Sequence, residues 1–456
     1  MNIPLDHLYH WIRGCAVEPV SIYTFCPHGS KNILDLNFFE CQDANLIRPD
    51  IVCHDQEPLN FEMHKTVDVY ELRSKKTKPE NKNLKYFTLD QDSKTIARAL
   101  VLHFKHLNFA AMIQLLKGRA IFDRYILLHS EKNSSDVGKF LSTAEPVYYW
   151  CHGIIARDWY RFAEHDPRLN CPPVHEKTFL VYCRAWTGTR EYRLKFLDLL
   201  VEHNLLEHCK TSVLHHDQEF DLGSYVCTNA EFQPINHKHL QSLSNNVYSS
   251  SASADYCVED FVSTDISVVL ETIAADTKIH LTEKTLRPIA CGHPFMLVAG
   301  PGSLDYLRSY GFKTFSPWID ESYDLETDIA TRMKLITKEM QRIENFLPLQ
   351  KQNFLTQIQS IAAYNKNHFF SNEFFNKIHN ELVDNLNLAI TRVKATRGQH
   401  YLAKKAIIKK FRPTHQPPLR KNKELALAKV LRQLRQDPTI SLKSLINQYP
   451  NGFFNS

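Results

Sequence analysis

The chain has 456 residues, about three times the usual length of one domain, so two domains or one domain with large additions are expected. Hydrophobic residues make up 43% and charged residues 23%, an ordinary globular composition that excludes a disordered, collagenous or coiled-coil protein. The formal net charge of +5 conceals an asymmetry, because residues 392–435 hold fourteen Lys or Arg against one acid, so that segment is +13 and the rest sums to −8. This asymmetry indicates a polyanionic partner for the basic segment, or else a solvated helix face followed by a loose tail.

Missing motifs exclude further classes of protein. No apolar run approaches the roughly 18 residues of a membrane helix, and the first residues lack the apolar core of a signal peptide. The eleven cysteines are scattered without a C-x-x-C pair, so we expect reduced thiols in a cytoplasmic protein (the host cytoplasm if the protein is viral). The thirteen glycines form no G-x-G-x-x-G, P-loop or G-x-S-x-G, which argues against a nicotinamide dehydrogenase, a P-loop ATPase and a nucleophile-elbow hydrolase.

The N-terminal half predicts a parallel sheet covered by helices. Short apolar runs that end in polar clusters predict strands within 21–26, 50–58, 85–92, 124–133 and 146–153, and a helical pattern covers 93–118. Apolar runs of this length alternating with helices are typical of a mostly parallel α/β sheet.

Polar residues that follow these predicted strands are candidates for catalysis, because ligands of such sheets bind beyond the carboxyl ends of the strands. Asp55 is the first candidate for a proton-accepting base, Glu57 the second, and His54 lies beside them. Further candidates for the base are His129, Glu131 and His152. Asp90 and Asp92 form a D-x-D, but Asp92 also suits the N-cap of the following helix, and no H-E-x-x-H occurs, so no metal site is predicted.

The pattern restarts after a proline-bearing join. Strands are expected within 178–185, 210–216, 265–272 and 294–300, and helices at 191–207, 283–292 and 302–311, followed by a mainly helical region. We therefore predict an α/β protein of two Rossmann-like domains, 1–170 and 171–327, a helical region 328–397, and a basic C-terminal extension 398–456.

The second half also carries a candidate anion site. Glu271 ends a predicted strand, Thr282 is placed to cap a helix that begins with Glu283 and Lys284, and Ser303 begins a further helix that faces the same cleft. We expect the capped helix to leave N–H groups for an anionic ligand. Arg184, Arg190 and Arg193 lie near the first strand and helix of this half, where arginine forks would match phosphate oxygens. Trp186 is expected to stack on a base or to fill the seam between domains.

The segment 267–315, with its Thr282-Glu283-Lys284 turn, resembles the C-terminal half of glycosyltransferases of the GT-B fold, in which two Rossmann-like domains face each other. The resemblance is close over 267–315 and loose over 178–320, and the chain also resembles glycosyltransferase-like proteins of tailed phages and marine metagenomes. It implies a metal-independent glycosyltransferase that needs no cofactor. The resemblance implies that the acid and lysine of this turn serve a nucleotide-sugar donor substrate in the second domain. Together with the residues named above, the predicted donor site comprises Arg184, Arg190, Glu271, Thr282, Glu283, Lys284 and Ser303.

The acceptor is expected to be a hydroxyl bound in the first domain. The basic extension favours hydroxymethylated pyrimidine in phage DNA, with Lys404, Lys405, Lys409, Lys410 and Arg412 on the phosphates. A surface polysaccharide or glycan is the alternative acceptor, and a non-catalytic nucleic-acid-binding protein is the alternative function. Retention and inversion of the sugar's configuration both stay open.

Overall fold

The structure is a computed structural model of the whole chain. It describes residues 3, 8–17, 21–25, 50–54, 125–141, 144–171, 174–217, 220–235, 240, 243 and 253–410. The chain divides into two compact units. Unit 1 comprises residues 1–5, 130–135 and 148–381, and unit 2 comprises 6–129, 136–147 and 382–456.

Unit 1 is built on a four-stranded parallel sheet. Its strands are β5 (Lys177–Cys183), β6 (Cys209–Val213), β9 (Thr264–Leu270) and β10 (Phe295–Val298), in the order β6-β5-β9-β10. Every residue of β9 and β10 is buried, which is typical of a parallel sheet that helices cover on both faces. The strands predicted within 178–185, 210–216, 265–272 and 294–300 are confirmed.

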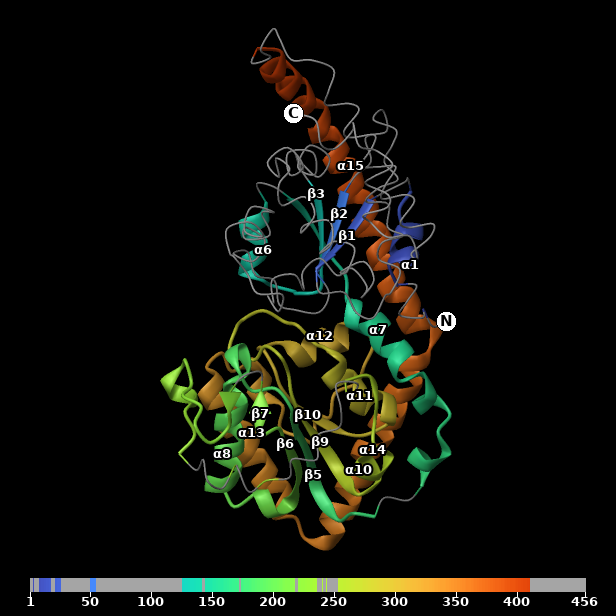
Figure 1. Cartoon of the computed structure of the whole chain (residues 1–456). Coiled ribbons are helices and arrows are strands. Elements are labelled where there is room, and N and C mark those ends of the chain that lie inside the picture. Colours follow the sequence, from blue (N-terminus) through green and yellow to red (C-terminus); the bar gives the residue numbers. More distant parts are fainter. Residues whose placement is uncertain are drawn as a thin grey trace, which may run out of the picture. The chain divides into compact units, whose positions relative to one another are not determined.

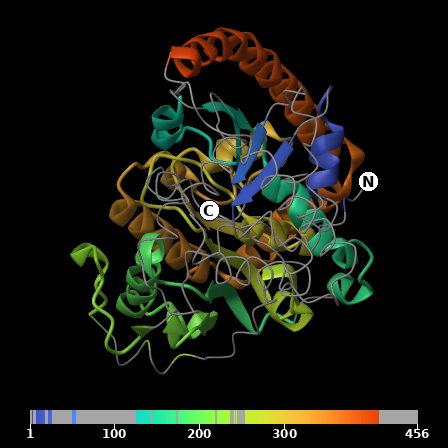
Figure 2. The ribbon, with the colours of Figure 1, turned by 45° about the horizontal axis from the view of Figure 1, so that its top comes forward.

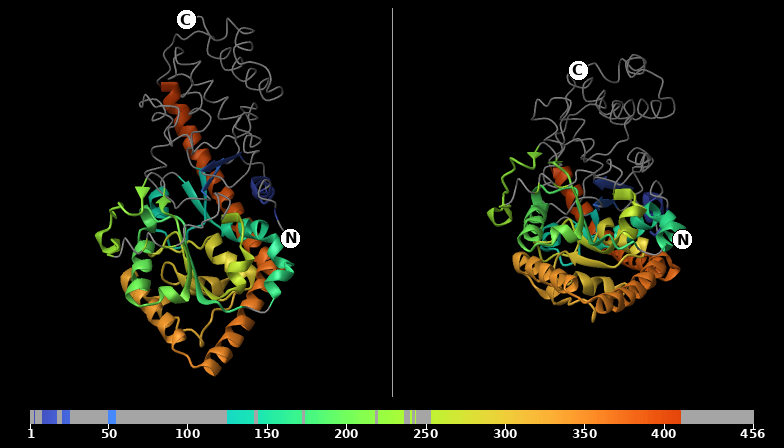
Figure 3. Two further views of the ribbon diagram at one scale, coloured as in Figure 1. Left: turned by 60° about the horizontal axis from the view of Figure 1, so that its bottom comes forward. Right: turned by 90° about the horizontal axis from the view of Figure 1, so that it is seen from below.

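Helices cover both faces of this sheet (Figure 1). Helices α8 (Tyr192–Glu202) and α13 (Ile329–Glu344) lie on one face, and α10 (Val258–Val262) and α11 (Glu283–Cys291) lie on the other. Helix α14 (Pro348–Phe370) packs against α11, and Figure 3 shows α13 and α14 meeting at the turn that joins them. Thr282 caps α11 at its start, and Gly292 ends it with a left-handed φ of 70°.

Unit 1 also contains shorter elements around the sheet. They are α7 (Cys151–Trp159), η5 (Arg161–Glu164), η6 (Pro167–Asn170), η7 (Gly188–Arg190), η8 (Leu206–His208), β7 (His216–Asp217), β8 (Phe220–Asp221), η9 (Ala230–Phe232), α12 (Ser303–Ser309) and η11 (Ser322–Leu325). Helix α7 is fixed to α14 by Arg157, whose guanidinium donates to the carbonyl oxygens of Phe369, Phe370 (2.9 Å) and Ser371 (3.1 Å). These bonds satisfy carbonyl groups that the last turn of α14 leaves without helical partners.

Unit 2 contains a second four-stranded sheet in the order β1-β2-β3-β4. Its strands are β1 (Ser21–Phe25), β2 (Asp50–His54), β3 (Tyr125–His129) and β4 (Ala144–Tyr148), and the pairs β1-β2 and β2-β3 are parallel. Helices α1 (Leu8–Gly14) and α6 (Ser135–Phe140) are the shorter helices described near it. The division between the units cuts β4 before Tyr148 and α6 after Ser135.

The long helix α15 (Asn372–Lys410) belongs to unit 1 up to Glu381 and to unit 2 from Leu382 onward, and its course can be followed in Figure 2. Within unit 2, Arg392 of α15 pairs with Glu145 of β4 (2.8 Å) and Val393 is buried. Helix α15 continues to Lys410, although the sequence predicted that the basic extension begins at residue 398. The helix can continue because no proline interrupts it before Pro413.

The α/β class with parallel sheets is thus confirmed for the described residues. The strand predicted within 85–92, the helix at 93–118 and all residues after 410 lie outside them, and the predicted domain boundaries stay predictions. Among the helices that the structure describes, none is long and apolar enough to cross a membrane.

Candidate functional site

The candidate site lies at the carboxyl edge of the unit 1 sheet, between β5 and β9. From β5 the chain continues to β6, which lies on one side of β5, and it later enters β9, which lies on the other side. The direction of the connections therefore reverses between β5 and β9. In α/β sheets the loops that follow such strands diverge and leave a crevice for a ligand. Here the two loops are joined where Thr189 Oγ1 donates to the carbonyl oxygen of Thr272 (3.4 Å).

Glu271 organises the loop after β9. Its carboxylate is completely buried and accepts five hydrogen bonds, which come from Thr272 N, Thr282 N, Thr282 Oγ1, Thr285 N and Thr285 Oγ1 at 2.6 to 3.3 Å. A carboxylate with this many internal donors has no face left for a ligand. Glu271, predicted to bind the donor, therefore holds the first turn of α11 against the end of β9.

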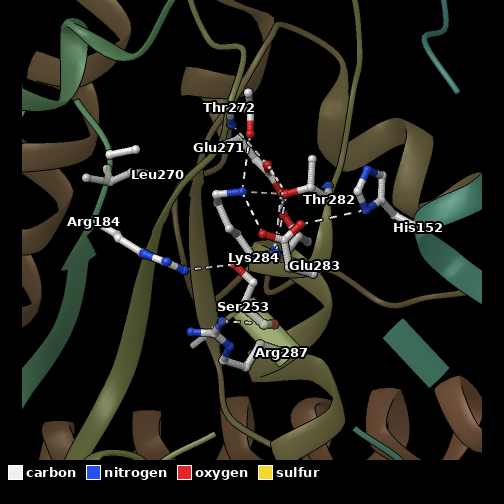
Figure 4. A network of polar contacts seen from close by, with 12 residues as sticks. His152, Arg184, Ser253, Leu270, Glu271, Thr272, Thr282, Glu283, Lys284 and Arg287 are labelled. Atoms are coloured by element: carbon white, nitrogen blue, oxygen red, sulfur yellow. Dashed lines mark hydrogen bonds and ion pairs between the residues drawn. The ribbon is translucent and has the colours of Figure 1, made fainter. Parts of the chain in front are cut away.

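Lys284 projects from this first turn and is partly exposed. Its Nζ lies 2.8 Å from Glu283 Oε1 and 3.2 Å from the hydroxyl oxygens of Thr272 and Thr282 (Figure 4). The other carboxylate oxygen of Glu283 lies 3.6 Å from Nδ1 of His152, which belongs to α7. Burial alone would raise the pKa of Glu283, but Lys284 and then His152 outweigh it and hold that pKa well below its usual range. Glu283 is therefore ionised.

Two arginines complete a cluster of three cations with Lys284. Arg184 follows β5 directly, and its Nη1 donates to Ser253 Oγ (3.3 Å). Arg287 lies one turn after Lys284 on α11 and donates to the hydroxyl of Tyr160 (3.2 Å) and to the carbonyl oxygen of Ser253 (3.2 Å). Figure 4 shows both arginines directed toward Ser253. Glu283 is the acid that contacts this cluster, so the site carries more positive than negative charge.

The loop after β5 is held in place by Asp217 of β7. Asp217 accepts hydrogen bonds from Trp186 N, Thr187 N and Thr187 Oγ1 at 2.7 to 2.8 Å. Gly188 follows with a φ of 64°, a conformation that favours glycine, and turns the chain into η7. Trp186 is completely buried, donates to the carbonyl oxygen of Leu214 and packs on Tyr225. The expectation that it stacks on a base or fills a domain seam is therefore wrong, because it belongs to the core of unit 1.

The other arginines of this loop have different positions. Arg193 is buried and donates to the carbonyl oxygens of Ala185, Leu270 and Glu271, so it ties together the ends of β5 and β9 and does not face a phosphate. Arg190 ends η7 and is half-buried. The neighbouring Glu191 accepts from Tyr225, Thr228 and Asn229, which anchors the 225–229 loop.

The first turns of α11 and α12 have fewer free N–H groups for an anionic ligand than the sequence predicted. Lys284 N donates to Thr282 Oγ1 (3.4 Å) and Thr285 N donates to Glu271, so the chain's own side chains occupy these N–H groups of α11. Ser303 is completely buried and donates to the carbonyl oxygen of Gly300, and Asp324 caps α12 by accepting from Leu304 N. Anion binding at this edge must therefore come from the side chains of Lys284 and the arginines.

The predicted catalytic and nucleic-acid-binding residues are mostly outside this description. His54 ends β2, where its Cα is paired with that of His129, but Asp55 and Glu57 lie outside the described residues. Lys404, Lys405, Lys409 and Lys410 lie on α15, of which only the backbone is described there, and Arg412 lies beyond it. Asp90 and Asp92 are outside as well. Within the described ranges, no group of three or more metal-ligating side chains occurs.

Two hollows are relevant to the site. A cavity of about 50 Å³ adjoins the cations and is lined by Tyr182, Lys284 and Arg287 together with apolar residues of β5 and β9. A larger groove of about 660 Å³ lies around residues 316–325 and includes Arg308 and Arg342. These two arginines pair with Glu321 and Glu339. The candidate site is therefore defined by its cations at the switch between β5 and β9, because the smaller cavity has room for only a few water molecules.

Sequence reasoning named His152 only as a further candidate for the base, and it missed Arg287, Tyr160 and Ser253. Arg287 had a signal, because residues three apart on a helix share a face and Lys284 was already a candidate. Tyr160 and Ser253 reach the site from distant segments, and no local pattern marks them. Comparison of the chain with protein-family models, with curated proteins and with solved structures found no match.

Proposed function

We propose that the chain is a cytoplasmic, metal-independent glycosyltransferase that takes a nucleotide sugar as its donor. The observation that carries this proposal is the cluster of Arg184, Lys284 and Arg287 at the point where the connections of a parallel sheet reverse. A diphosphate leaving group needs positive charge, which side chains supply where no metal is bound. The arginine forks match phosphate oxygens, and the ionised Glu283 beside them accepts hydrogen bonds from sugar hydroxyls.

The proposal includes a GT-B arrangement. Unit 1 would then be the donor domain, and the sheet of unit 2 would carry the acceptor and the base at the carboxyl end of β2, with Asp55, Glu57 and His54 as candidates. The supporting argument is that both sheets have parallel strands, so that each has one edge at which carboxyl ends and their loops gather.

A binding experiment tests the donor site. UDP-, GDP- and CMP-sugars at millimolar concentration should raise the melting temperature of the full chain, because a ligand above its Kd stabilises the folded state. Lys284→Ala and Arg184→Ala should each weaken binding and transfer by more than about tenfold, or roughly 1.4 kcal/mol. Arg190→Ala tests the third predicted contact in the same way. Lys334→Ala, an exposed lysine of α13 in the same unit, is the matched control.

The result that refutes the donor site is equally definite. If neither the nucleotide sugars nor bare UDP and GDP change the melting temperature, the chain does not bind such donors. If they bind, and Lys284→Ala and Arg184→Ala bind as well as Lys334→Ala does, then the donor lies elsewhere.

For the acceptor we propose a hydroxymethylated pyrimidine of DNA, supported by the charge of +13 in residues 392–435. Since α15 is continuous to Lys410, truncation should follow that residue. Truncation, or changing Lys404, Lys405, Lys409 and Lys410 to Gln, should weaken use of hydroxymethylated duplex. Either change should also reduce the slope of DNA affinity against salt concentration by the amount expected for several lost phosphate contacts. Nucleotide-sugar binding should be unchanged.

Two alternatives are separated by the same measurements. Transfer to a polysaccharide or glycan, with none to DNA and no effect of the truncation, would favour the alternative acceptor. Salt-dependent DNA binding without any nucleotide-sugar binding would favour a non-catalytic nucleic-acid-binding protein.

A further inference from the structure

Ser253 is the residue on which the cationic site converges. Its side-chain oxygen Oγ accepts a hydrogen bond from Nη1 of Arg184 (3.3 Å), and its carbonyl oxygen accepts from Nη2 of Arg287 (3.2 Å). The carbonyl oxygen also accepts from the hydroxyl of Tyr160 (2.6 Å). Dashed lines in Figure 4 join both arginines to Ser253. Two of the three cations of the site are therefore directed at two oxygen atoms of a single residue.

The donors that meet the carbonyl oxygen of Ser253 are held in place by other contacts as well. Nε of Arg287 donates to the hydroxyl of Tyr160 (3.2 Å), and the guanidinium of Arg287 lies 5.8 Å from the ring centres of both Tyr160 and Tyr182. Tyr160 is completely buried, and its hydroxyl lies 3.3 Å from the carbonyl oxygen of Glu283. The direction of Arg287 and Tyr160 therefore does not depend on Ser253 alone.

Ser253 itself is partly exposed, and the chain that follows it is fixed independently. The hydroxyl of Tyr256 donates to the carboxylate of Asp166 (3.0 Å), and α10 begins at Val258. A movement of Ser253 away from the arginines therefore needs no movement of α10 or of β9, which follows α10.

The donors around Ser253 are of the kind that bind a phosphate group. Arginine and hydroxyl donors match the neighbouring oxygens of a phosphate, and bonds to a charged phosphate are about twice as strong as bonds to neutral serine oxygens. The cavity beside the cations, about 50 Å³, is far smaller than the roughly 300–1,000 Å³ of ordinary ligand pockets. A phosphate ligand must therefore displace part of the chain to reach these donors.

We propose that Ser253 occupies a phosphate subsite formed by Arg184, Arg287 and Tyr160, and that it competes with the ligand for their donors. This inference rests on the proposed function, because the phosphate belongs to the nucleotide-sugar donor. Binding replaces the two serine oxygens by anionic phosphate oxygens. Since only molecules in which Ser253 has withdrawn can bind, the contact lowers the apparent affinity and acts as an internal inhibitor of the site.

Affinity for inorganic pyrophosphate measures this competition directly, since pyrophosphate supplies the anion without a sugar or a base. Isothermal titration calorimetry of the full chain, with EDTA present to remove metal ions, gives the Kd. Ser253→Ala deletes the oxygen that Arg184 contacts, and it should raise the affinity about fivefold, or about 1 kcal/mol, the contribution of one hydrogen bond. Ser253→Asp places a carboxylate before the arginines, and it should lower the affinity by more than about tenfold.

Two further measurements separate competition from support of the fold. Ser263 is the matched control, because its Oγ also accepts from a cation, Lys210 (3.0 Å), but lies at the amino end of β9, away from the site. Ser263→Ala should leave pyrophosphate affinity unchanged. In an Arg184→Ala background, Ser253→Ala should bring no gain, because the contact that it relieves is already absent.

The proposal and the proposed function fail in different ways. An unchanged or weaker affinity in Ser253→Ala, or an equal gain with and without Arg184, would overturn the competition. So would the absence of pyrophosphate binding in both the wild type and Ser253→Ala. Nucleotide sugars are titrated into the same variants. If they bind and Ser253→Ala changes the affinity for neither ligand, the proposed function stands and the competition alone fails. If pyrophosphate behaves as expected and no nucleotide sugar binds, the phosphate subsite stands and the glycosyltransferase fails.

Discussion

At the scale of single residues, Glu271 and Glu283 show how two carboxylates at one helix start take different roles. Glu271 accepts five internal hydrogen bonds and positions the turn, whereas Glu283 lies between Lys284 and His152. Both are acids that follow or precede a threonine, so their local sequence does not separate them. Only the number of internal donors around each carboxylate does so.

The role of Glu271 can be measured as stability. In Glu271→Gln one carboxylate oxygen becomes an amide donor, which leaves buried donors of Thr272, Thr282 or Thr285 unpaired. We expect the free energy of unfolding to fall by about 2 kcal/mol or more, since buried unsatisfied groups and bonds to charged acceptors are worth that much. Urea unfolding measures the loss. Glu202→Gln, at a partly exposed carboxylate of α8 that pairs with Lys195, is the control and should change stability little. Equal stability of the two variants would show that Glu271 does not hold the turn.

At the scale of elements, the loop after β9 depends on its contact with the end of β10. An added Cβ at Gly300 would lie 2.5 Å from the carbonyl oxygen of Lys278 and 3.0 Å from that of Asp276. Both are backbone atoms, so they cannot move aside as the end of a flexible side chain would. The segment they belong to continues through His280 to the first turn of α11. The absence of a side chain at Gly300 therefore helps to position the site.

Substitution of Gly300 tests this contact. Gly300→Ala should lower the free energy of unfolding by about 1–3 kcal/mol, the usual cost of overpacking, and should weaken nucleotide-sugar binding because the loop must shift. Differential scanning fluorimetry with and without the nucleotide sugar measures both effects. Gly138→Ala in α6, where an added Cβ meets nothing within 4 Å, should leave nucleotide-sugar binding unchanged. Wild-type binding by Gly300→Ala would contradict the proposed link.

At the scale of the whole molecule, a buried acid makes global stability depend on pH. Burial raises the pKa of Asp324 to about 6, although hydrogen bonds from the backbone of α12 oppose the shift. The folded chain then binds this proton more tightly than the unfolded chain does. The stabilisation from that proton is fully present below the ordinary aspartate pKa of about 3.9 and is lost as the pH rises through about 6.

The difference between wild type and Asp324→Asn isolates this effect. Between pH 4 and pH 6, the free energy of unfolding of the wild type should fall relative to that of the variant, by about 3 kcal/mol at most. Urea unfolding at several pH values provides the measurement. Asp305→Asn, an exposed acid of α12, should run parallel to the wild type. A wild type that gains stability relative to Asp324→Asn over this range would show that the carboxyl is not protonated as proposed.

Much of the site was visible in the sequence because its parts are local. An apolar run ending at Glu271, a threonine cap at Thr282 and a lysine in the first helical turn are short-range patterns, and the structure places Thr282 and Lys284 as expected. Arg184 was found in the same way, since it follows β5 directly. The roles of Arg193 and Trp186 were assigned wrongly, because residue type and spacing do not show on which side of a loop a side chain is buried.

The sequence by itself therefore determined the four strands of the unit 1 sheet, helices α8, α11 and α12, the parallel α/β class and the position of the Thr282–Lys284 turn. These follow from hydrophobic periodicity and capping, which act between residues close in the chain. The tertiary structure alone decided that Arg287, Ser253 and Tyr160 meet at one place. It also decided that internal hydrogen bonds occupy the carboxylate of Glu271, and that His280 faces Ser130. Such contacts join residues up to 150 positions apart, and they arise only when the sheet order β6-β5-β9-β10 brings their segments together.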